Sequence, residues 1–383
     1  MLAILIFPHA AGARANGTPS RTAKNQKLPR PQPLGQGPAL VRDAVSGELH
    51  SAANDSSTPG AGTIRSRVTL VEVPCTVTAP DGTEVRGLAR NDFQLFEDGV
   101  PQEIASFDAS ATPASIALVI DASPSIYRKL EVMREAAQAL AETLSPSDAI
   151  AVVSFSDQAH LLLPFSTNRN LLERVIDSKY LARVENSSES QIYQSVFFAA
   201  RDLFWGRTGR KAIVLLTDGQ DSGVGLTWNP RSTEPRSGRE ADRLSFDDVA
   251  RELGADGIAL FIVSTENRPR AMTPEWLEAH QGAMLVTPEA RKLNMPSYTL
   301  YLAELARRVG GRMDFLGETG NLGEIYHRIA LAISAQYTLG YYPSAGTAQP
   351  GWRSLRVEFA HGANVPAGAR VTHRGSYYVS AFP

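Results

Sequence analysis

Carboxylates and hydroxyls follow two apolar runs of the chain, and these side chains have the types and spacing that could do chemistry. The segment IALVIDASPS places Asp121, Ser123 and Ser125 directly after aliphatic residues. In KAIVLLTDG, Asp218 stands at the end of a second apolar run. Ligands of open α/β sheets bind beyond the carboxyl ends of the strands. Oxygen donors delivered to that edge predict a site for a hard cation.

A structural interpretation of the same residues stays open. Asp and Ser favour the first turn of a helix, so Asp121, Ser123 and Ser125 could act only as capping residues for the helix that follows. Asp218 favours the metal interpretation, because it places a further acid at the end of a separate strand. Asp221, two residues beyond the TDG segment, is interpreted as a loop carboxylate, and the alternative is an acid that supports the metal ligands from outside.

The elements that must position these residues alternate between strands and helices after Pro113. Apolar runs predict strands over 116–120, 149–155, 211–219, 258–265 and 312–316, and a further apolar segment covers 161–165. Apolar residues at helical spacing predict helices over 127–144, 168–180, 192–205, 245–257, 300–311 and 321–336. This order is typical of parallel βαβ units, so we expect an α/β fold with a mostly parallel sheet.

Shorter β segments lie on both sides of this region. Before it, Val71, Val73 and Cys75 alternate with other residues, and a second strand pattern follows over 91–107. After it, strand patterns cover 337–343, 354–359 and 374–380. Two short open sheets would each expose unpaired backbone. We therefore expect the N-terminal module 65–110 and the C-terminal strands of 338–383 to pair in one β-sandwich around the α/β domain, 111–337.

The N-terminal sixty residues predict a leader and a linker. Residues 1–15 combine an apolar stretch with Ala13-Arg14-Ala15, which is typical of a signal-peptide cleavage site, although the usual basic start is missing. Residues 16–64 are rich in Pro, Gly, Ser and Asn without periodicity, which predicts a disordered linker. We therefore expect a secreted or periplasmic protein.

Composition excludes several classes of partner and chemistry. A formal net charge of −2 over 383 residues argues against a nucleic-acid partner, and no apolar stretch predicts a transmembrane segment. The chain has no Gly-x-Ser-x-Gly elbow, no Walker A sequence, no Gly-x-Gly-x-x-Gly fingerprint and no His-Glu-x-x-His motif. An aspartyl-phosphate role for Asp121 would need an acid where Ser123 stands. We therefore expect no enzyme.

The strand-borne Asp121-x-Ser123-x-Ser125 motif, a hydroxyl residue before IYQSVFFAA, and Thr217-Asp218-Gly219 occur in an order that resembles the von Willebrand factor type A (vWA) domain. The resemblance covers about 111–337 and implies a Rossmann-like, doubly wound sheet with a metal-ion-dependent adhesion site, abbreviated MIDAS. The flanking segments GLARNDFQLFEDG and YTLGYYP resemble an exported, acidobacterial-type subgroup related to this domain.

The resemblance implies a set of metal ligands in this chain. It assigns Asp121, Ser123, Ser125 and Asp218 to a divalent cation, directly or through water. It aligns Ser190 with a threonine of the family, and the family's preceding Gly-Gly is Ser-Glu here. Serine keeps the hydroxyl and loses the methyl that restrains the rotamer. An ordinary helix N-cap is the other interpretation of Ser190.

The expected function is metal-dependent protein binding, or adhesion. Neutral hydroxyls with few carboxylates leave a bound Mg²⁺, Mn²⁺ or Ca²⁺ with residual positive charge, which an acidic side chain of a protein partner would complete. Two alternatives stay open. The scaffold could bind partners without metal through loops 222–243 and 266–297, or the site could belong to a metal-dependent hydrolase whose base the sequence does not display.

Overall fold

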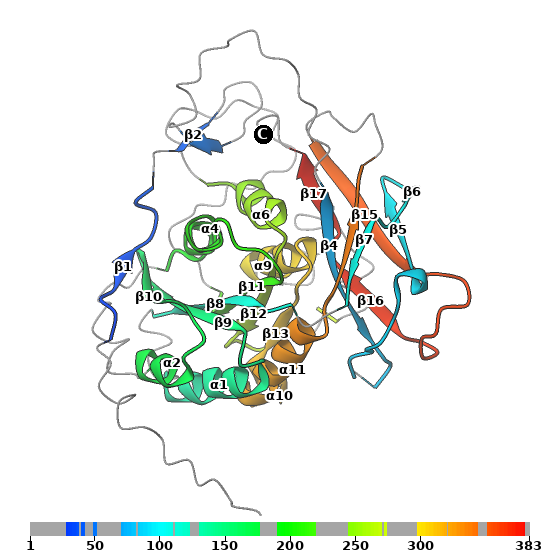
Figure 1. Cartoon of the computed structure of the whole chain (residues 1–383). Helices are drawn as coiled ribbons and strands as arrows, with labels where there is room; N and C mark the ends of the chain where they lie inside the picture. Colours follow the sequence, from blue (N-terminus) through cyan, green and yellow to red (C-terminus); the bar gives the residue numbers. More distant parts are fainter. Residues whose placement is uncertain are drawn as a thin grey trace, which may run out of the picture.

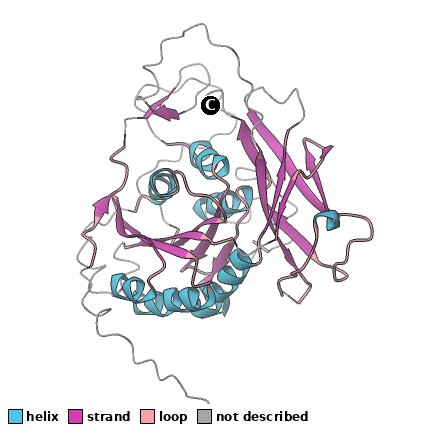
Figure 2. Ribbon diagram, in the orientation of Figure 1, coloured by secondary structure: helices cyan, strands magenta, loops and turns pink. Residues whose placement is uncertain are grey.

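The structure is a computed structural model of the whole chain. It describes residues 28–37, 40–42, 49–51, 70–81, 83–109, 112–122, 130–176, 190–219, 244–269, 272–273, 297–319, 321–343 and 351–379. Figure 2 shows helices around one sheet and a second group of strands beside them. The predicted signal peptide, 1–15, and loop 222–243 lie outside the described residues, as does most of loop 266–297.

A seven-stranded mixed sheet forms the centre of the α/β domain, in the order β1-β10-β9-β8-β11-β12-β13. Five neighbouring strands run parallel: β9 (Ala149–Phe155), β8 (Ser115–Asp121), β11 (Lys211–Thr217), β12 (Ile258–Ser264) and β13 (Met313–Phe315). At one edge, β10 (Ala159–Ser166) and β1 (Gln32–Pro33) are antiparallel to their neighbours. The predicted Rossmann-like, mostly parallel fold is confirmed.

Helices cover both faces of this sheet (Figure 1). One face holds α1 (Leu130–Thr143), α2 (Arg169–Val175), α10 (Leu316–Thr319) and α11 (Leu322–Ser334). The other holds α4 (Ile192–Leu203), α6 (Phe246–Ala255) and α9 (Ser297–Arg308). Side chains of β8 alternate between the faces, since Ile116 and Leu118 join the first core and Ala117 and Val119 the second. Both faces of each central strand are buried, which explains its continuous apolar run.

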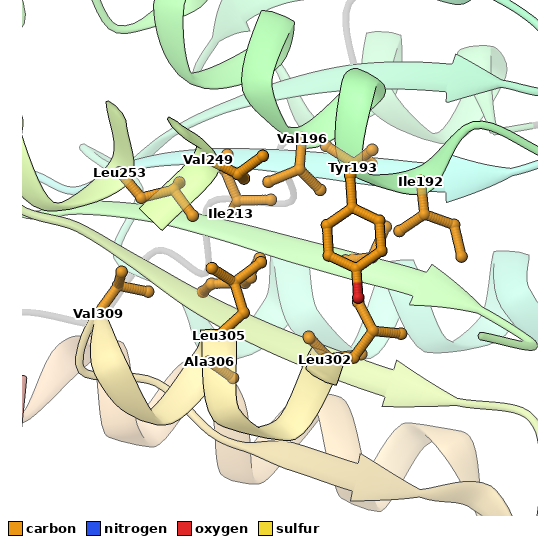
Figure 3. Packing of buried hydrophobic residues seen from close by; sticks show 14 of the residues in the cluster. Ile192, Tyr193, Val196, Ile213, Val249, Leu253, Leu302, Leu305, Ala306 and Val309 are labelled. Carbon is orange, nitrogen blue, oxygen red and sulfur yellow. The ribbon is translucent and has the colours of Figure 1, made fainter. Parts of the chain in front are cut away.

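Figure 3 shows the second core, where aliphatic side chains from α4, α6 and α9 meet those of the sheet.

The starts of several helices are fixed by capping residues in the local sequence. Ser245 caps α6, its hydroxyl accepting from the Asp248 backbone N–H while the Asp248 carboxylate accepts from the Ser245 backbone N–H. Asn168 caps α2 and Asn321 caps α11, each through a side-chain oxygen that accepts a hydrogen bond from one backbone N–H.

The connection between β9 and β10 departs from the predicted alternation. Only three residues separate the strands, and they pair antiparallel, with Ala159 opposite Phe155. A parallel pair would need a crossover of a dozen or more residues, so a connection of this length forces a hairpin.

The flanking β segments form two four-stranded sheets. One has the order β16-β4-β14-β7, with bounds Arg370–His373, Val71–Thr78, Tyr337–Tyr341 and Ser106–Asp108. The other has the order β17-β15-β5-β6, with bounds Ser376–Val379, Gly351–Phe359, Phe93–Glu97 and Val100–Gln102. In the first sheet, strands from before and after the α/β domain alternate. In the second, β15 from after the domain pairs with β5 from before it, so the expected pairing of the two chain ends is confirmed.

The two β sheets share a buried core that includes Val73, Cys75 and Leu95. Burial raises the pKa of the Cys75 thiol, so this lone cysteine packs as a small apolar side chain. A polar cluster lies in the same interior, where the hydroxyls of Tyr341 and Tyr377 both donate to Oε2 of Glu97, at 2.5 and 3.2 Å.

Cationic side chains join the sandwich to the α/β domain. Arg374 is buried and donates from Nη1 to the carbonyl oxygen of Gly254, in the last turn of α6, at 2.7 Å. The guanidinium of Arg251 lies 4.9 Å from the ring centre of Tyr378, and that of Arg308 lies 5.1 Å from Trp352. Cations over aromatic rings and at a helix C-terminus are favourable, so α6 and α9 are the helices that hold the sandwich.

Residues 28–51 differ from the predicted linker wherever the structure describes them. Gln32 pairs with Leu161 of β10, and β2 (Leu40–Arg42) pairs with β3 (Leu49–Ser51) as a hairpin. Leu34 and Leu40 pack against the second core. Sequence periodicity does not reveal this order, because it depends on contacts with distant residues. The predicted limits at 65, 111 and 338 stay predictions.

Candidate metal centre

The register of the central sheet brings the ends of β8 and β11 together. Ile120 pairs with Leu216 in parallel, so the next residues, Asp121 and Thr217, lie side by side. Thr217 Oγ1 donates to Asp121 Oδ2 at 2.8 Å. Both side chains are fully buried. The Thr217-Asp218-Gly219 motif alone predicts no role for Thr217, and the signal for this contact is the position of Thr217 as the last residue of a strand parallel to β8.

Ser190 reaches the same carboxylate from the segment before α4. The backbone N–H of Gln191 donates to the carbonyl oxygen of Ser156, which follows β9, at 2.8 Å, and this bond holds the segment at the sheet edge. Ser190 Oγ donates to Asp121 Oδ2 at 3.2 Å. The N-cap of α4 is Gln191, so the hydroxyl of Ser190 contacts the carboxylate rather than capping that helix from the N-cap position.

Asp218 follows Thr217 at the carboxyl end of β11 and is 6% exposed. The turn after it is fixed by Gly219, whose φ is 84° and whose backbone N–H donates to Thr217 Oγ1 at 3.0 Å. A side chain at this φ would be strained, so glycine suits the position. The N–H of Thr265 donates to the carbonyl oxygen of Thr217 at 3.0 Å, which ties β11 to the end of β12.

Ser123 and Ser125 lie outside the described residues. Of the predicted ligands, the structure therefore brings together Asp121 and Ser190, adds Thr217 to them, and places Asp218 next to Thr217 in the chain. Within the ranges that the structure describes, no three His, Cys, Asp or Glu side chains gather where they could hold a metal ion.

The donor chemistry of this cluster fits a hard cation. A hydroxyl that donates its proton to Asp121 keeps acceptor capacity on its oxygen, and the atoms that meet here are carboxylate and hydroxyl oxygens. Mg²⁺, Mn²⁺ and Ca²⁺ prefer such oxygen donors, whereas thiolates and imidazoles suit softer metals. Burying a carboxylate is costly unless it is hydrogen-bonded or paired with a cation, and Asp121 has two hydroxyl donors on one oxygen.

Part of the chain that carries this cluster matches a known domain family. Residues 115–273 match the von Willebrand factor type A domain. The match spans β8 to β12 and therefore includes Asp121, Ser190 and Asp218. A search of curated proteins finds no match.

Solved structures similar to this chain come from several organisms. An aerotolerance-related membrane protein from Bacteroides fragilis, carrying multiple mutations to serine, is 15% identical, with 57% of this chain and 98% of that chain covered and a TM-score of 0.39. A von Willebrand factor type A protein from Catenulispora acidiphila is 13% identical, with 76% and 74% covered and a TM-score of 0.39. Proximal thread matrix protein 1 from the mussel byssus, with a zinc-occupied MIDAS motif, is 15% identical, with 61% and 48% covered and a TM-score of 0.38.

No helix among the described parts of the chain is both long and apolar enough to cross a membrane.

Proposed function

We propose that the vWA domain is a protein-binding module whose ligand face carries a MIDAS-type divalent cation. The observation that carries the proposal is the convergence of two hydroxyls, from separate segments, on the buried carboxylate of Asp121 at the carboxyl edge of the sheet. The vWA match supports an interaction module rather than an enzyme.

Each residue has a separate role in this proposal. Ser123, Ser125 and Ser190 would offer neutral hydroxyl oxygens to the cation, while Asp121 and Asp218 would supply negative charge directly or through water. Thr217 would hold the carboxylate of Asp121 in place, since its hydroxyl donates to that group and is itself fixed by the N–H of Gly219. The cation supplies Lewis acidity and a coordination position for a partner.

The partner would contribute an acidic side chain. A Mg²⁺ or Mn²⁺ ion held mainly by hydroxyls keeps residual positive charge and an incomplete octahedral shell. A carboxylate from another protein satisfies both, and charge-assisted contacts of this kind are the strong ones in recognition. The expected affinity of the protein alone for metal is low, with a Kd on the order of 10⁻⁴–10⁻³ M, because the last ligand comes from the partner.

Calorimetric titration of Mg²⁺ and Mn²⁺ into the full chain tests the metal site. We expect saturable binding that weakens at least tenfold in Asp218→Asn and Ser190→Ala. Glu173→Gln, which removes an exposed carboxylate on α2, is the matched control and should bind as the unaltered chain does. Equal metal binding in all four proteins, or metal binding in none of them with folding intact, would refute the metal site. The remaining hypothesis would then be a scaffold that binds partners without metal.

A second experiment tests the acidic partner. An immobilised glycine-flanked glutamate peptide should retain the full chain in Mg²⁺ and release it in chelator, while the matching glutamine peptide should retain nothing. Retention that is the same for both peptides, or the same in chelator, would contradict recognition of a carboxylate through metal.

We also propose that the protein is exported, which the apolar N-terminal stretch and Ala13-Arg14-Ala15 support. Fusion of residues 1–64 to a phosphatase that is active only outside the cytoplasm should give an active enzyme. A fusion that stays inactive inside bacterial cells would contradict export.

A further inference from the structure

The hydroxyl of Ser190 is held at the sheet edge from two sides. On one side, the N–H of Gln191 donates to the carbonyl oxygen of Ser156 at 2.8 Å, and Ser156 belongs to the short turn between β9 and β10. On the other side, α4 begins at Ile192. The position of Ser190 Oγ, 3.2 Å from Asp121 Oδ2, therefore depends on how the β9–β10 turn and α4 lie relative to each other.

The N-terminal segment 28–37, which we call the strap, lies across both of these elements. Within it, β1 pairs antiparallel with the start of β10, as Figure 1 shows. The N–H of Leu34 then donates to the carbonyl oxygen of Ala159 at 2.8 Å. Because Ala159 pairs with Phe155, the last residue of β9, this bond lies directly beside the turn that carries Ser156. The strap therefore fixes the end of β10 from which this turn extends.

Beyond Leu34 the strap crosses to α4. The N–H of Gly35 donates to Asp202 Oδ2 at 2.7 Å. A Cβ at Gly35 would lie 2.8 Å from the ring of Phe198, and its φ of +79° is a conformation that other residues rarely adopt. Leu34 packs against the second core, to which Ile192 in the first turn of α4 also belongs. One short segment thus contacts both β10 and α4.

A charged pair holds the chain just beyond the strap. Arg42 donates from Nη1 and Nη2 to the two carboxylate oxygens of Asp248 on α6, at 3.1 and 2.7 Å. The Asp248 side chain is 1% exposed, so this pair is screened little by solvent. Bidentate arginine–carboxylate pairs combine strength with geometric specificity. The strap is therefore supported by an anchor on a second helix.

We infer that the strap positions Ser190 for metal binding, so that docking of the strap and occupation of the candidate metal centre stabilise each other. This inference rests on the proposed metal site. A segment that bridges β10 and α4 restricts their relative movement, and a ligand oxygen must be held to within about 0.5 Å of its productive position. Serine depends on this support more than threonine does, because it lacks the methyl group that restrains the rotamer. Coupling between two sites is reciprocal, so metal should tighten the strap as the strap tightens metal binding.

Metal titration of a chain with a released strap tests the coupling. Gly35→Val places a side chain against α4 at an unfavourable φ, so it should displace the strap while every residue of the candidate metal centre stays in place. We expect the Kd for Mg²⁺ and Mn²⁺ in calorimetric titration to rise about three- to tenfold, the change that corresponds to one net hydrogen bond.

Gly87→Val is the matched control. Gly87 also has a positive φ, of +81°, but it lies before β5 of the sandwich, and a Cβ there would meet nothing within 4 Å. This variant should bind metal as the unaltered chain does. Hydrogen exchange of the Leu34 amide establishes whether the strap is released, and Arg42→Ala is added to Gly35→Val if that amide stays protected. An unchanged Kd in a chain whose Leu34 amide exchanges faster would overturn the coupling.

Exchange of the Gln191 amide without metal separates this inference from the proposed function. Because its N–H bonds to the carbonyl oxygen of Ser156, it should exchange about threefold faster or more in Gly35→Val, and at the unaltered rate in Gly87→Val. An unchanged Gln191 amide in a chain with a released strap would overturn the positioning of Ser190. Absence of metal binding by the unaltered chain would refute the proposed function, whereas equal metal binding with and without the strap would refute only this inference.

Discussion

The carboxyl group of Glu97 is held in the interior of the sandwich by two phenols, and this cluster predicts a measurable coupling. Tyr341, on β14, donates at 2.5 Å, and Tyr377, on β17, donates at 3.2 Å to the same oxygen. Glu97 itself comes from β5 and is 2% exposed. Burial, and then the hydrogen bond with Glu97, raises the pKa of Tyr341, so this phenol stays a neutral donor through the physiological range.

The expected loss of stability follows from the charge of the acceptor and the burial of the hydrogen bond. A hydrogen bond to a charged group contributes about 1.5–3 kcal/mol, and a buried carboxylate that loses its donor has no water to replace it. Tyr341→Phe should therefore lower the free energy of unfolding by about 2 kcal/mol. Tyr377→Phe removes the longer bond and should cost about 1 kcal/mol.

A double-mutant cycle isolates the interaction. In a Glu97→Met background, which removes the acceptor at similar volume, Tyr341→Phe should cost less than about 0.5 kcal/mol, giving a coupling of about 1.5 kcal/mol or more. Urea unfolding of the four proteins measures the cycle, and hydrogen exchange of β5 and β14 amides assigns it to the sandwich. A coupling under about 0.5 kcal/mol would show that the short bond contributes nothing net to stability.

Three further predictions concern other parts of the fold. Burial, reinforced by the nearby charge of Asp256, raises the pKa of Glu252 to about 7, so ionisation of this group above its unfolded pKa lowers the stability of the native state. Glu252→Gln should therefore raise the free energy of unfolding by about 1–3 kcal/mol at pH 8 and leave it unchanged near pH 4. Urea titrations at both pH values measure the difference. Deletion of 338–383 removes both neighbours of β4, the strands β14 and β16, so the melting profile measured by differential scanning calorimetry should lose the contribution of the sandwich. An unchanged melting profile would count against pairing of the chain ends. A Cβ at Gly311 would lie 1.9 Å from the carbonyl oxygen of Leu260, so Gly311→Ala should lower the melting temperature by several degrees, whereas Gly254→Ala, which meets open space, should not.

The central fold could be predicted because its signals are local. The run that became β9 was predicted at its observed bounds, and alternating strands and helices imply a parallel sheet without knowledge of distant contacts. The ends of β8 and β11 were predicted to lie together for the same reason. The register that sets Thr217 beside Asp121 was not predictable, since periodicity assigns a strand to an element but does not pair its individual residues.

The contact of Arg42 with Asp248 and the burial of Arg374 could not be predicted, and the physical reason is the same for both. Arg42 meets Asp248 across 206 positions, and Arg374 meets Gly254 across 120. Residues in a Pro- and Gly-rich segment, or an arginine near the end of the chain, are usually solvated, so composition predicts a linker and a surface charge. Contacts with residues distant in the sequence order both arginines against this compositional expectation.

The insertion of the α/β domain between β7 and β14 has a consequence for synthesis. Roughly 230 residues separate the end of β7 at Asp108 from the start of β14 at Tyr337. At about 5–20 residues per second, a ribosome needs roughly 10–50 s to make that stretch. During this interval β4 and β7 have emerged without β14, the strand that lies between them, whereas β8 to β13 can assemble. The α/β domain can therefore complete first, whereas the sandwich can close only after its C-terminal strands have been made.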